Sequence, residues 1–304
     1  MKFLKKDLHG IKFYWLLIAL SLAIIGIAFG SAFDMDISDA LYNKDSWLGN
    51  FFETYVLAFC YLIFPLGGMS LMLGLLKSKK KGWKAFGIVM YVISFLLAVY
   101  LSKVALSEKN EYGYTVSDTL AYFLGIIVAI LGSAIGFLFL DKEKSNECIK
   151  GGSFLLVGCS LILLTSGLGL KYVAARPRYR FLMGDALDQT GLGLTFKNWW
   201  EWTPFSHNSG DYFKSWPSGH TSAAFCFCLL PFLGAASKKT NKYTSVILFG
   251  IGFAFTLLMA LARIVIGAHF LSDVSSALAI GVLLTLLGYA LVDFISQKKI
   301  KETN

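Results

Sequence analysis

Residues 13–33 read FYWLLIALSLAIIGIAFGSAF, a run of 21 residues without a charged side chain. A helix needs about 20 apolar residues to cross the hydrocarbon core of a bilayer. Every backbone N–H and C=O group in that core must find a partner within the protein, which favours a helix. A secretory signal is the alternative, but the run is longer than the usual apolar part of a signal peptide. The stretch therefore predicts an uncleaved membrane-spanning helix.

Seven further stretches share this apolar character. They lie at about residues 51–76, 83–106, 117–140, 150–170, 219–236, 243–262 and 270–296. The chain is 56% hydrophobic and only 15% charged, with a mean hydropathy of +0.62, whereas soluble domains carry about 25% charged residues. This composition excludes a soluble enzyme and a disordered chain. The sequence predicts an all-α fold, a polytopic transmembrane helical bundle with about eight spans.

The net charge of +9 does not indicate a nucleic-acid partner, because the lysines lie in short runs between the apolar stretches. If the N-terminus is inside, 18 of the 28 Lys and Arg residues fall in cytoplasmic segments, as the positive-inside rule requires. The count predicts a multi-pass protein of the plasma (inner) membrane with both termini cytoplasmic. The five cysteines are interpreted as small buried hydrophobic residues.

One predicted external loop, residues 171–218, is much longer than the others. Loops well beyond about 12–15 residues are usually functional or disordered. The loop contains Trp199, Trp200, Trp202 and Trp216. Tryptophans commonly lie at the level of the lipid headgroups, so these four are interpreted as an interfacial belt or as a wall that grips a lipid substrate.

Three short clusters place cations and histidines at predicted membrane edges, where charge is costly. The first reads Lys171-Tyr-Val-Ala-Ala-Arg176-Pro-Arg178-Tyr-Arg180 and follows the fifth span. Four cations on the outer side run against the positive-inside trend. They form either a basic rim that snorkels to the surface or an anion pocket, because guanidinium groups bind phosphate oxygens in pairs.

The second cluster, Trp216-Pro-Ser-Gly-His220-Thr-Ser, begins the sixth span. Ser218 is expected to cap this helix, and Gly219 allows close approach of a ligand to the backbone. Free amides at a helix N-terminus attract anions, and His220 would lie at the mouth of such a site. The same pattern is also typical of an ordinary helix start.

The third cluster lies between the last two spans and contains Arg263, His269 and Asp273. His269 and Asp273 are four residues apart, so on a helix they share one face. We therefore expect the carboxylate to contact the imidazole and fix its tautomer, as in hydrolase triads. All three clusters fall at the outer ends of spans and can converge on one external site. Because no compact set of metal-ligating residues appears on that side, we expect metal-independent phosphoryl transfer.

The three clusters resemble the three motifs of the type 2 phosphatidic acid phosphatase (PAP2) superfamily, which includes membrane lipid phosphatases and vanadium haloperoxidases. Lys171 and Arg178 keep the spacing of the first motif, although Tyr179 replaces its final proline. The second motif, Pro-Ser-Gly-His, is intact at residues 217–220. The resemblance is to the membrane lipid phosphatase branch.

The third motif is matched by Arg263, His269 and Asp273, with Ala262 in place of the serine before the arginine. The resemblance implies a six-helix PAP2-like phosphatase core in residues 81–304, which includes the external loop 171–218. Two extra transmembrane helices would then occupy residues 1–80.

The resemblance also implies roles for the motif residues. His269 would be the nucleophile that forms a phosphohistidine, and Asp273 would orient it. His220 would protonate the leaving alkoxide and then activate water. The phosphate would be bound by Lys171, Arg178 and Arg263, and by the amides of Ser218 and Gly219. No metal or other cofactor is implied, and Arg176 and Arg180, which are not motif positions, are interpreted as contacts to the substrate headgroup or the lipid surface.

The sequence thus predicts an integral-membrane lipid phosphate phosphatase whose site faces the extracytoplasmic side. Its partners would be membrane lipids and a lipid phosphate substrate, with phosphatidic acid, phosphatidylglycerol phosphate and isoprenoid diphosphates all compatible. One alternative is a phosphotransferase that passes the phosphate of the same phosphohistidine to another acceptor. Another is a non-catalytic protein that binds or transports lipids, although binding alone would not require two histidines and an aspartate at the site.

Overall fold

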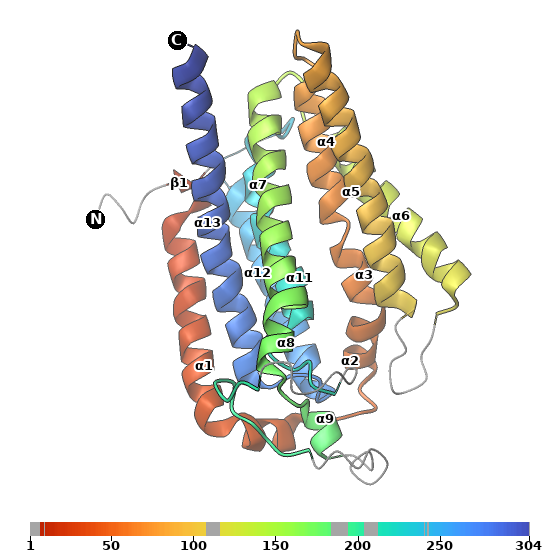
Figure 1. Ribbon diagram of the computed structural model, residues 1–304, viewed down its shortest axis with the longest axis vertical. Helices are drawn as coiled ribbons and strands as arrows, with labels where there is room; N and C mark the ends of the chain where they lie inside the picture. The colour runs from red at the N-terminus through yellow and green to blue at the C-terminus, as the bar shows by residue number, and fades with distance from the viewer. Residues whose placement is uncertain are drawn as a thin grey trace.

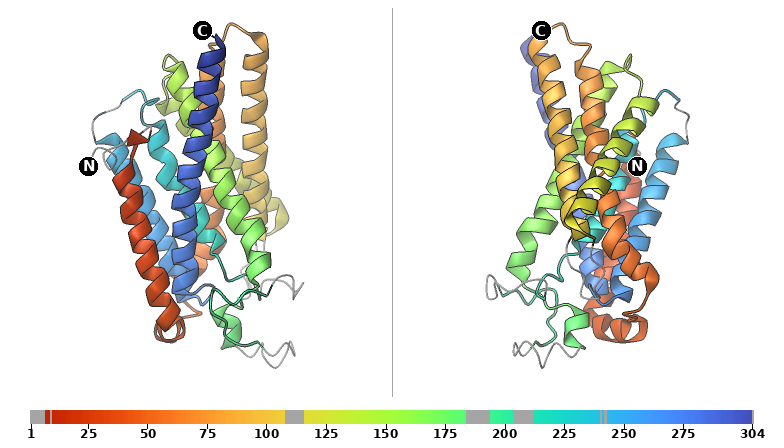
Figure 2. Two further views of the ribbon diagram at one scale, coloured as in Figure 1. Left: turned by 60° about the vertical axis from the view of Figure 1, so that its left-hand side comes forward. Right: turned by 90° about the vertical axis from the view of Figure 1, so that its right-hand side faces the viewer.

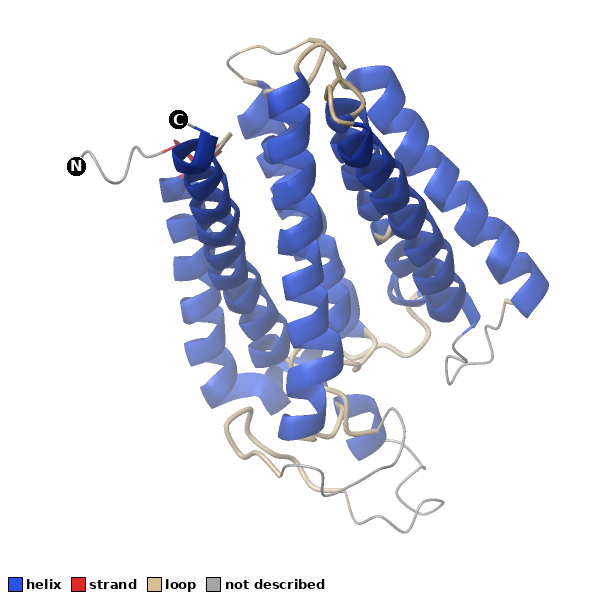
Figure 3. Ribbon diagram, turned by 45° about the horizontal axis from the view of Figure 1, so that its top comes forward, coloured by secondary structure: helices blue, strands red, loops and turns tan. Residues whose placement is uncertain are grey.

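The computed structural model of the 304-residue chain describes residues 7–8, 10–107, 116–183, 194–203, 212–239, 241 and 243–303. These residues form a bundle of helices with one two-stranded antiparallel sheet near the N-terminus (Figures 1 and 3). The expected all-α fold is confirmed. In chain order the elements are β1 (Asp7–Leu8), β2 (Ile11–Lys12), α1 (Phe13–Leu41), α2 (Trp47–Phe51), η2 (Phe52–Val56), α3 (Leu57–Cys60), α4 (Ile63–Leu75), α5 (Lys81–Ser107), α6 (Asp118–Phe139), α7 (Ser145–Leu163), η3 (Leu164–Gly169), α8 (Leu170–Ala174), α9 (Tyr179–Leu182), α11 (Gly219–Phe225), η4 (Cys226–Leu233), α12 (Thr244–Val265) and α13 (Leu271–Thr303).

Seven helical segments in the described part of the chain are long and apolar enough to cross a membrane, and they correspond to seven of the eight expected stretches. They are Phe13–Leu41, Trp47–Leu75, Lys81–Ser107, Asp118–Phe139, Ser145–Ala174, Thr244–Val265 and Leu271–Val292. The remaining stretch forms the shorter apolar helix Gly219–Leu233. Its second half, η4, is a 3₁₀ helix that contains Pro231. Because a 3₁₀ helix rises about 2.0 Å per residue, the segment is about 26 Å long, close to the roughly 30 Å of a bilayer core.

The second segment, Trp47–Leu75, lies at the centre of the bundle. In its most apolar window 78% of the residues are buried, against 22–50% in the other six. It packs against α5, α6 and α7, whereas α5 and α6 pack mainly on this segment and on each other. Helix α1 packs along α13. The packing therefore places residues 47–75 inside the bundle and the α5–α6 pair at its periphery, while the predicted division at residue 80 stays a prediction.

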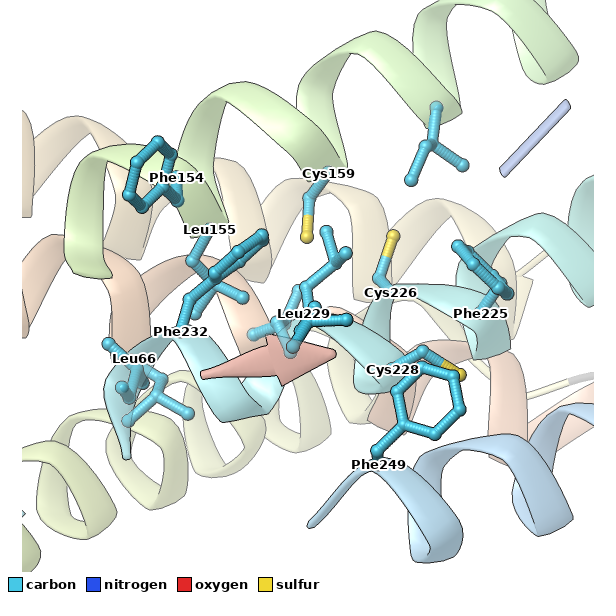
Figure 4. Packing of buried hydrophobic residues seen from close by; sticks show 14 of the residues in the cluster. Leu66, Phe154, Leu155, Cys159, Phe225, Cys226, Cys228, Leu229, Phe232 and Phe249 are labelled. Carbon is cyan, nitrogen blue, oxygen red and sulfur yellow. The ribbon is translucent and has the colours of Figure 1, made fainter. Parts of the chain in front are cut away.

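The main hydrophobic core lies between α4, α7 and η4, with further buried residues from α1, α12 and α13. Figure 4 shows Cys159 of α7 and Cys226 of η4 with their sulfur atoms directed into the same part of this core. Phe154 packs against Phe232 with ring centroids 4.9 Å apart and the rings tilted by 34°. All five cysteines are buried and free, which confirms their interpretation as small hydrophobic residues.

The two ends of the bundle differ. Helix α1 begins and α13 ends at one end, whereas α8, α9 and the first turn of α13 lie at the other (Figures 1 and 2). The described parts of the loop 171–218 also lie at this second end. The fold thus brings the three sequence clusters to the end of the bundle opposite to the start of α1 and the end of α13.

Candidate active site

The first cluster is largely buried and contains one unusual backbone conformation. Helix α8 ends at Ala174, and the next residue, Ala175, has a φ of 45° in the left-handed region, which is uncommon for a residue with a Cβ. Lys171 is only 9% exposed. A Cβ atom on Gly219 would lie 3.5 Å from its Cε and Nζ atoms. The first and second clusters are therefore in direct contact through Lys171 and Gly219.

Arg176 is buried between two carboxylates. Its side chain donates from Nη1 to Asp273 Oδ1 at 2.5 Å and from Nη2 to Asp34 Oδ2 at 2.9 Å. Its guanidinium carbon also lies 4.2 Å from the ring centroid of Phe270. A buried charge is tolerated when it is paired and hydrogen-bonded in this way. The interpretation of Arg176 as a headgroup or lipid-surface contact is therefore wrong, because carboxylates from α1 and α13 hold it inside the protein.

Glu53, in the π-helical segment η2, pairs with two arginines. Its Oε1 atom accepts from Arg180 Nη1 at 3.0 Å and from Arg263 Nη2 at 3.1 Å. Its backbone oxygen lies 3.4 Å from His220 Nε2. Arg180 is 5% exposed, so its interpretation as a lipid-surface contact is also wrong. Sequence reasoning missed Glu53, although a lone carboxylate in the apolar stretch 51–76 was a signal, since such residues usually have a function.

The second cluster begins α11 as expected. The Ser218 hydroxyl accepts a hydrogen bond from the Thr221 amide at 3.3 Å, which confirms the predicted cap. The Ser218 amide, in turn, donates to the backbone oxygen of Asp273 at 3.3 Å. This bond joins the second cluster to the third. It also means that the Ser218 amide has a protein acceptor in this structure.

His269 is held by a backbone carbonyl. Its Nδ1 atom lies 2.5 Å from the Ser215 oxygen but 3.9 Å from Asp273 Oδ2, too far for a hydrogen bond. The carboxylate therefore lies close to the imidazole, as expected, but does not hydrogen-bond to it, because α13 begins two residues after His269 and the helical spacing does not apply. Asp273 Oδ2 instead accepts from the Ser215 hydroxyl at 2.6 Å and from the Phe270 amide at 2.8 Å. Asp273 thus reaches His269 through Ser215, which sequence reasoning missed because a backbone carbonyl leaves no side-chain signal.

These contacts fix the state of the His269 ring. A carbonyl oxygen only accepts, so Nδ1 must carry a proton, and in the neutral ring Nε2 then keeps its lone pair. Nε2 is buried and has no hydrogen-bond partner among the described residues. Burial, reinforced by the charges of Lys171, Arg263, Arg178 and His220, holds the pKa of His269 well below its ordinary value. His269 is therefore a neutral imidazole with an available Nε2 at neutral pH.

Arg263 is the most deeply buried cation near His269. Its side chain is fully buried, and within the described ranges its Nε and Nη1 atoms have no hydrogen-bond partner. Buried donors without partners require an explanation. The charges of Lys171 and Arg178 act on the same neutral imidazole, and a group of cations beside such a ring is suited to binding a phosphoryl group.

The tryptophans of the loop 171–218 pack against one another and contact α1. Trp199 stacks on Trp216 with centroids 6.2 Å apart, and its Nε1 atom donates to Ser31 Oγ at 2.9 Å. Trp216 is only 5% exposed, so for this residue the interpretation as an interfacial belt is wrong. Trp200 and Trp202 are about half-exposed and fit either interpretation. Other loop residues of interest lie outside the described ranges, namely Asp185, Asp188, Phe205, His207 and Asp211.

The part of the chain that the structure describes holds no group of three or more His, Cys, Asp or Glu residues placed to bind a metal ion.

Residues 151–296 match the family model of the PAP2 superfamily, and this range includes all three clusters. A comparison with curated proteins and with solved structures gives no match.

Proposed function

The chain belongs to the PAP2 superfamily, and on that premise we propose that it is an integral-membrane lipid phosphate phosphatase. The observation that carries the proposal is the state of His269, a buried neutral imidazole with its Nε2 lone pair available beside cationic side chains. A nucleophile with these properties attacks phosphorus directly. His269, His220 and Asp273 act in catalysis, and no metal ion is required.

In the first step the Nε2 atom of His269 attacks phosphorus and forms the N–P bond of a phosphohistidine. The bond between phosphorus and the lipid oxygen breaks, and His220, which takes up a proton when the anionic substrate binds, donates that proton to the leaving oxygen. The Nδ1–H group of His269 stays bonded to the Ser215 carbonyl. This bond stabilises the positive charge that the ring acquires when Nε2 is phosphorylated.

In the second step His220 accepts a proton from water, whose oxygen attacks the phosphohistidine. The N–P bond breaks and inorganic phosphate leaves. Lys171, Arg178 and Arg263 bind the phosphoryl oxygens in both steps, together with the Gly219 amide and, once its bond to Asp273 is released, the Ser218 amide. Preorganised donors of this kind are worth about 3 kcal/mol each in the transition state.

An apolar groove beside the site supports a lipid substrate. A cavity of about 510 Å³ lies between η2, α6 and α12, and its lining includes Phe52, Val56, Leu124 and Phe255. Phe52 directly precedes Glu53, the residue that pairs with Arg263. A hydrocarbon tail can lie in this groove while the phosphate reaches His269. The site also lies at the end of the bundle opposite to the start of α1 and the end of α13 (Figure 2), which, with the lysine count, supports an extracytoplasmic site and cytoplasmic termini.

The proposal is tested by measuring inorganic phosphate release from the detergent-purified protein with EDTA present. The substrates are phosphatidic acid, phosphatidylglycerol phosphate and an isoprenoid diphosphate. We expect release from at least one of them, and EDTA should not reduce the rate. If no lipid is hydrolysed, the hydrolase proposal fails, and transfer to added alcohols or lipids then tests the phosphotransferase alternative.

The indirect link between Asp273 and His269 gives a second prediction. Ser215→Ala removes the hydroxyl that Asp273 binds but keeps the carbonyl that holds His269, so kcat should fall about tenfold as the carbonyl loses its fixed position. Ser70→Ala is the matched control, because it also removes a buried, hydrogen-bonded hydroxyl, in this case one that donates to the backbone oxygen of Cys148. Its kcat should stay at the wild-type value. A wild-type kcat in Ser215→Ala would show that Asp273 does not act through Ser215.

A further inference from the structure

Glu53 comes from outside the segment that matches the family. It lies in the second span, whereas the match covers residues 151–296. Its side chain is 10% exposed, and its Oε1 atom bridges Arg263 and Arg180 at 3.1 and 3.0 Å. A carboxylate at this depth is expensive unless it is paired. The pairing therefore explains how Glu53 is tolerated, but not why it is there.

Arg263 has more hydrogen-bond donors than its pair with Glu53 uses. Arg263 uses Nη2 for Glu53, while its Nε and Nη1 atoms have no hydrogen-bond partner within the described residues. Arg263 can therefore bind Glu53 and a phosphoryl oxygen at the same time. A carboxylate and a phosphate that share one buried guanidinium repel each other strongly, because the interaction is poorly screened there.

We infer that Glu53 is the resident counter-ion of the phosphate site. Its carboxylate neutralises Arg263 and Arg180 while phosphate is absent. When phosphate is bound, the same carboxylate lowers the affinity of the site for it. The inference rests on the proposed function, in which Arg263 binds the phosphoryl group. A hydrolase must release inorganic phosphate after each turnover, and a site whose arginines had no other anion would release it slowly.

The test is the affinity of the full-length, detergent-purified protein for inorganic phosphate, measured by isothermal titration calorimetry without a lipid substrate. Glu53→Gln keeps the shape of the side chain but removes its charge, so its Kd for phosphate should fall about tenfold. Glu53→Asp keeps the charge but withdraws it by one methylene, so its Kd should fall by a smaller factor, about threefold. The matched control is Glu143→Gln, which breaks an exposed pair with Lys77 and should leave the Kd unchanged.

Steady-state kinetics give a readout that loss of structure would not produce. In Glu53→Gln the KM for the lipid phosphate and the kcat should both fall, because binding becomes tighter and phosphate release becomes slower. A disrupted site would instead raise KM. If Glu53→Gln does not fold, Glu53→Asp decides the question by the same measurement.

An unchanged or weaker affinity in the variants would overturn the inference and show that Glu53 only orients the arginines. If the wild-type protein hydrolyses lipid phosphates in that case, the proposed function still stands. If it binds phosphate but hydrolyses nothing, the proposed function fails and the comparison of Kd values still decides the role of Glu53. If the wild-type protein does not bind phosphate at all, both are wrong.

Discussion

His269→Ala is expected to reduce phosphate release to the background rate, a loss of about 10³-fold or more. The variant lacks the Nε2 atom that the proposed mechanism uses as nucleophile, and His220, the other histidine among the described residues, lies against the Glu53 carbonyl instead. The measurement is phosphate release from the best lipid substrate. Because Lys171, Arg178 and Arg263 remain, the variant should still bind inorganic phosphate, which separates loss of chemistry from loss of folding.

A control variant and a trapping experiment test the assignment of His269 as the nucleophile. His9→Ala, at a histidine outside the motifs and outside the described residues, should keep the wild-type rate. A rapid quench of the wild-type protein with a phosphate-labelled substrate should trap label that is stable in alkali and labile in acid, as expected of a phosphohistidine. Activity in His269→Ala, or label in that variant, would remove His269 as the nucleophile.

Much of the fold could be predicted because hydropathy and capping act locally. Apolar runs of about 20 residues define spans on their own, and seven of the expected stretches are helices of spanning length. The Ser218 cap depends on a residue only three positions away. The sixth stretch does not form one continuous α-helix, because its second half is a 3₁₀ segment that contains Pro231. Short-range sequence patterns do not distinguish such a segment from an α-helix.

The carboxylates of the site could not be placed from the sequence, because their partners are distant. Asp34 and Arg176 are 142 residues apart, and Glu53 and Arg263 are 210 residues apart. Without these partners, a buried arginine and a surface arginine look the same in the sequence, and the sequence therefore predicts a headgroup or lipid-surface contact for Arg176. A residue spacing of four predicted the contact of His269 with Asp273, but that rule holds only inside a helix, and His269 precedes α13.

Asp273→Asn is expected to lower kcat about 100-fold, less than the roughly 10⁴-fold loss seen when an aspartate that bonds a catalytic histidine directly is changed in this way. Both carboxylate oxygens of Asp273 are used, Oδ1 by Arg176 and Oδ2 by the Ser215 hydroxyl and the Phe270 amide. An asparagine offers one acceptor oxygen, so its NH₂ group must face a donor on one side. If the NH₂ group faces Arg176, the guanidinium loses an acceptor; if it faces the other side, the Ser215 hydroxyl and the Phe270 amide lose theirs, and the Ser215 carbonyl is then less firmly held against His269.

The variant Asp118→Asn is the control, because it removes a carboxylate that is 72% exposed in its side chain and pairs with Lys103. Its kcat and melting temperature should match those of the wild type.

The link through Ser215 is tested by combining Asp273→Asn with Ser215→Ala. If Asp273 acts through Ser215, the double variant Asp273→Asn with Ser215→Ala should be about as slow as Asp273→Asn alone, because both changes break the same connection. Losses that multiply would show that Asp273 acts on His269 by a separate route, and a wild-type kcat in Asp273→Asn would show that its role is to hold Arg176 within the fold.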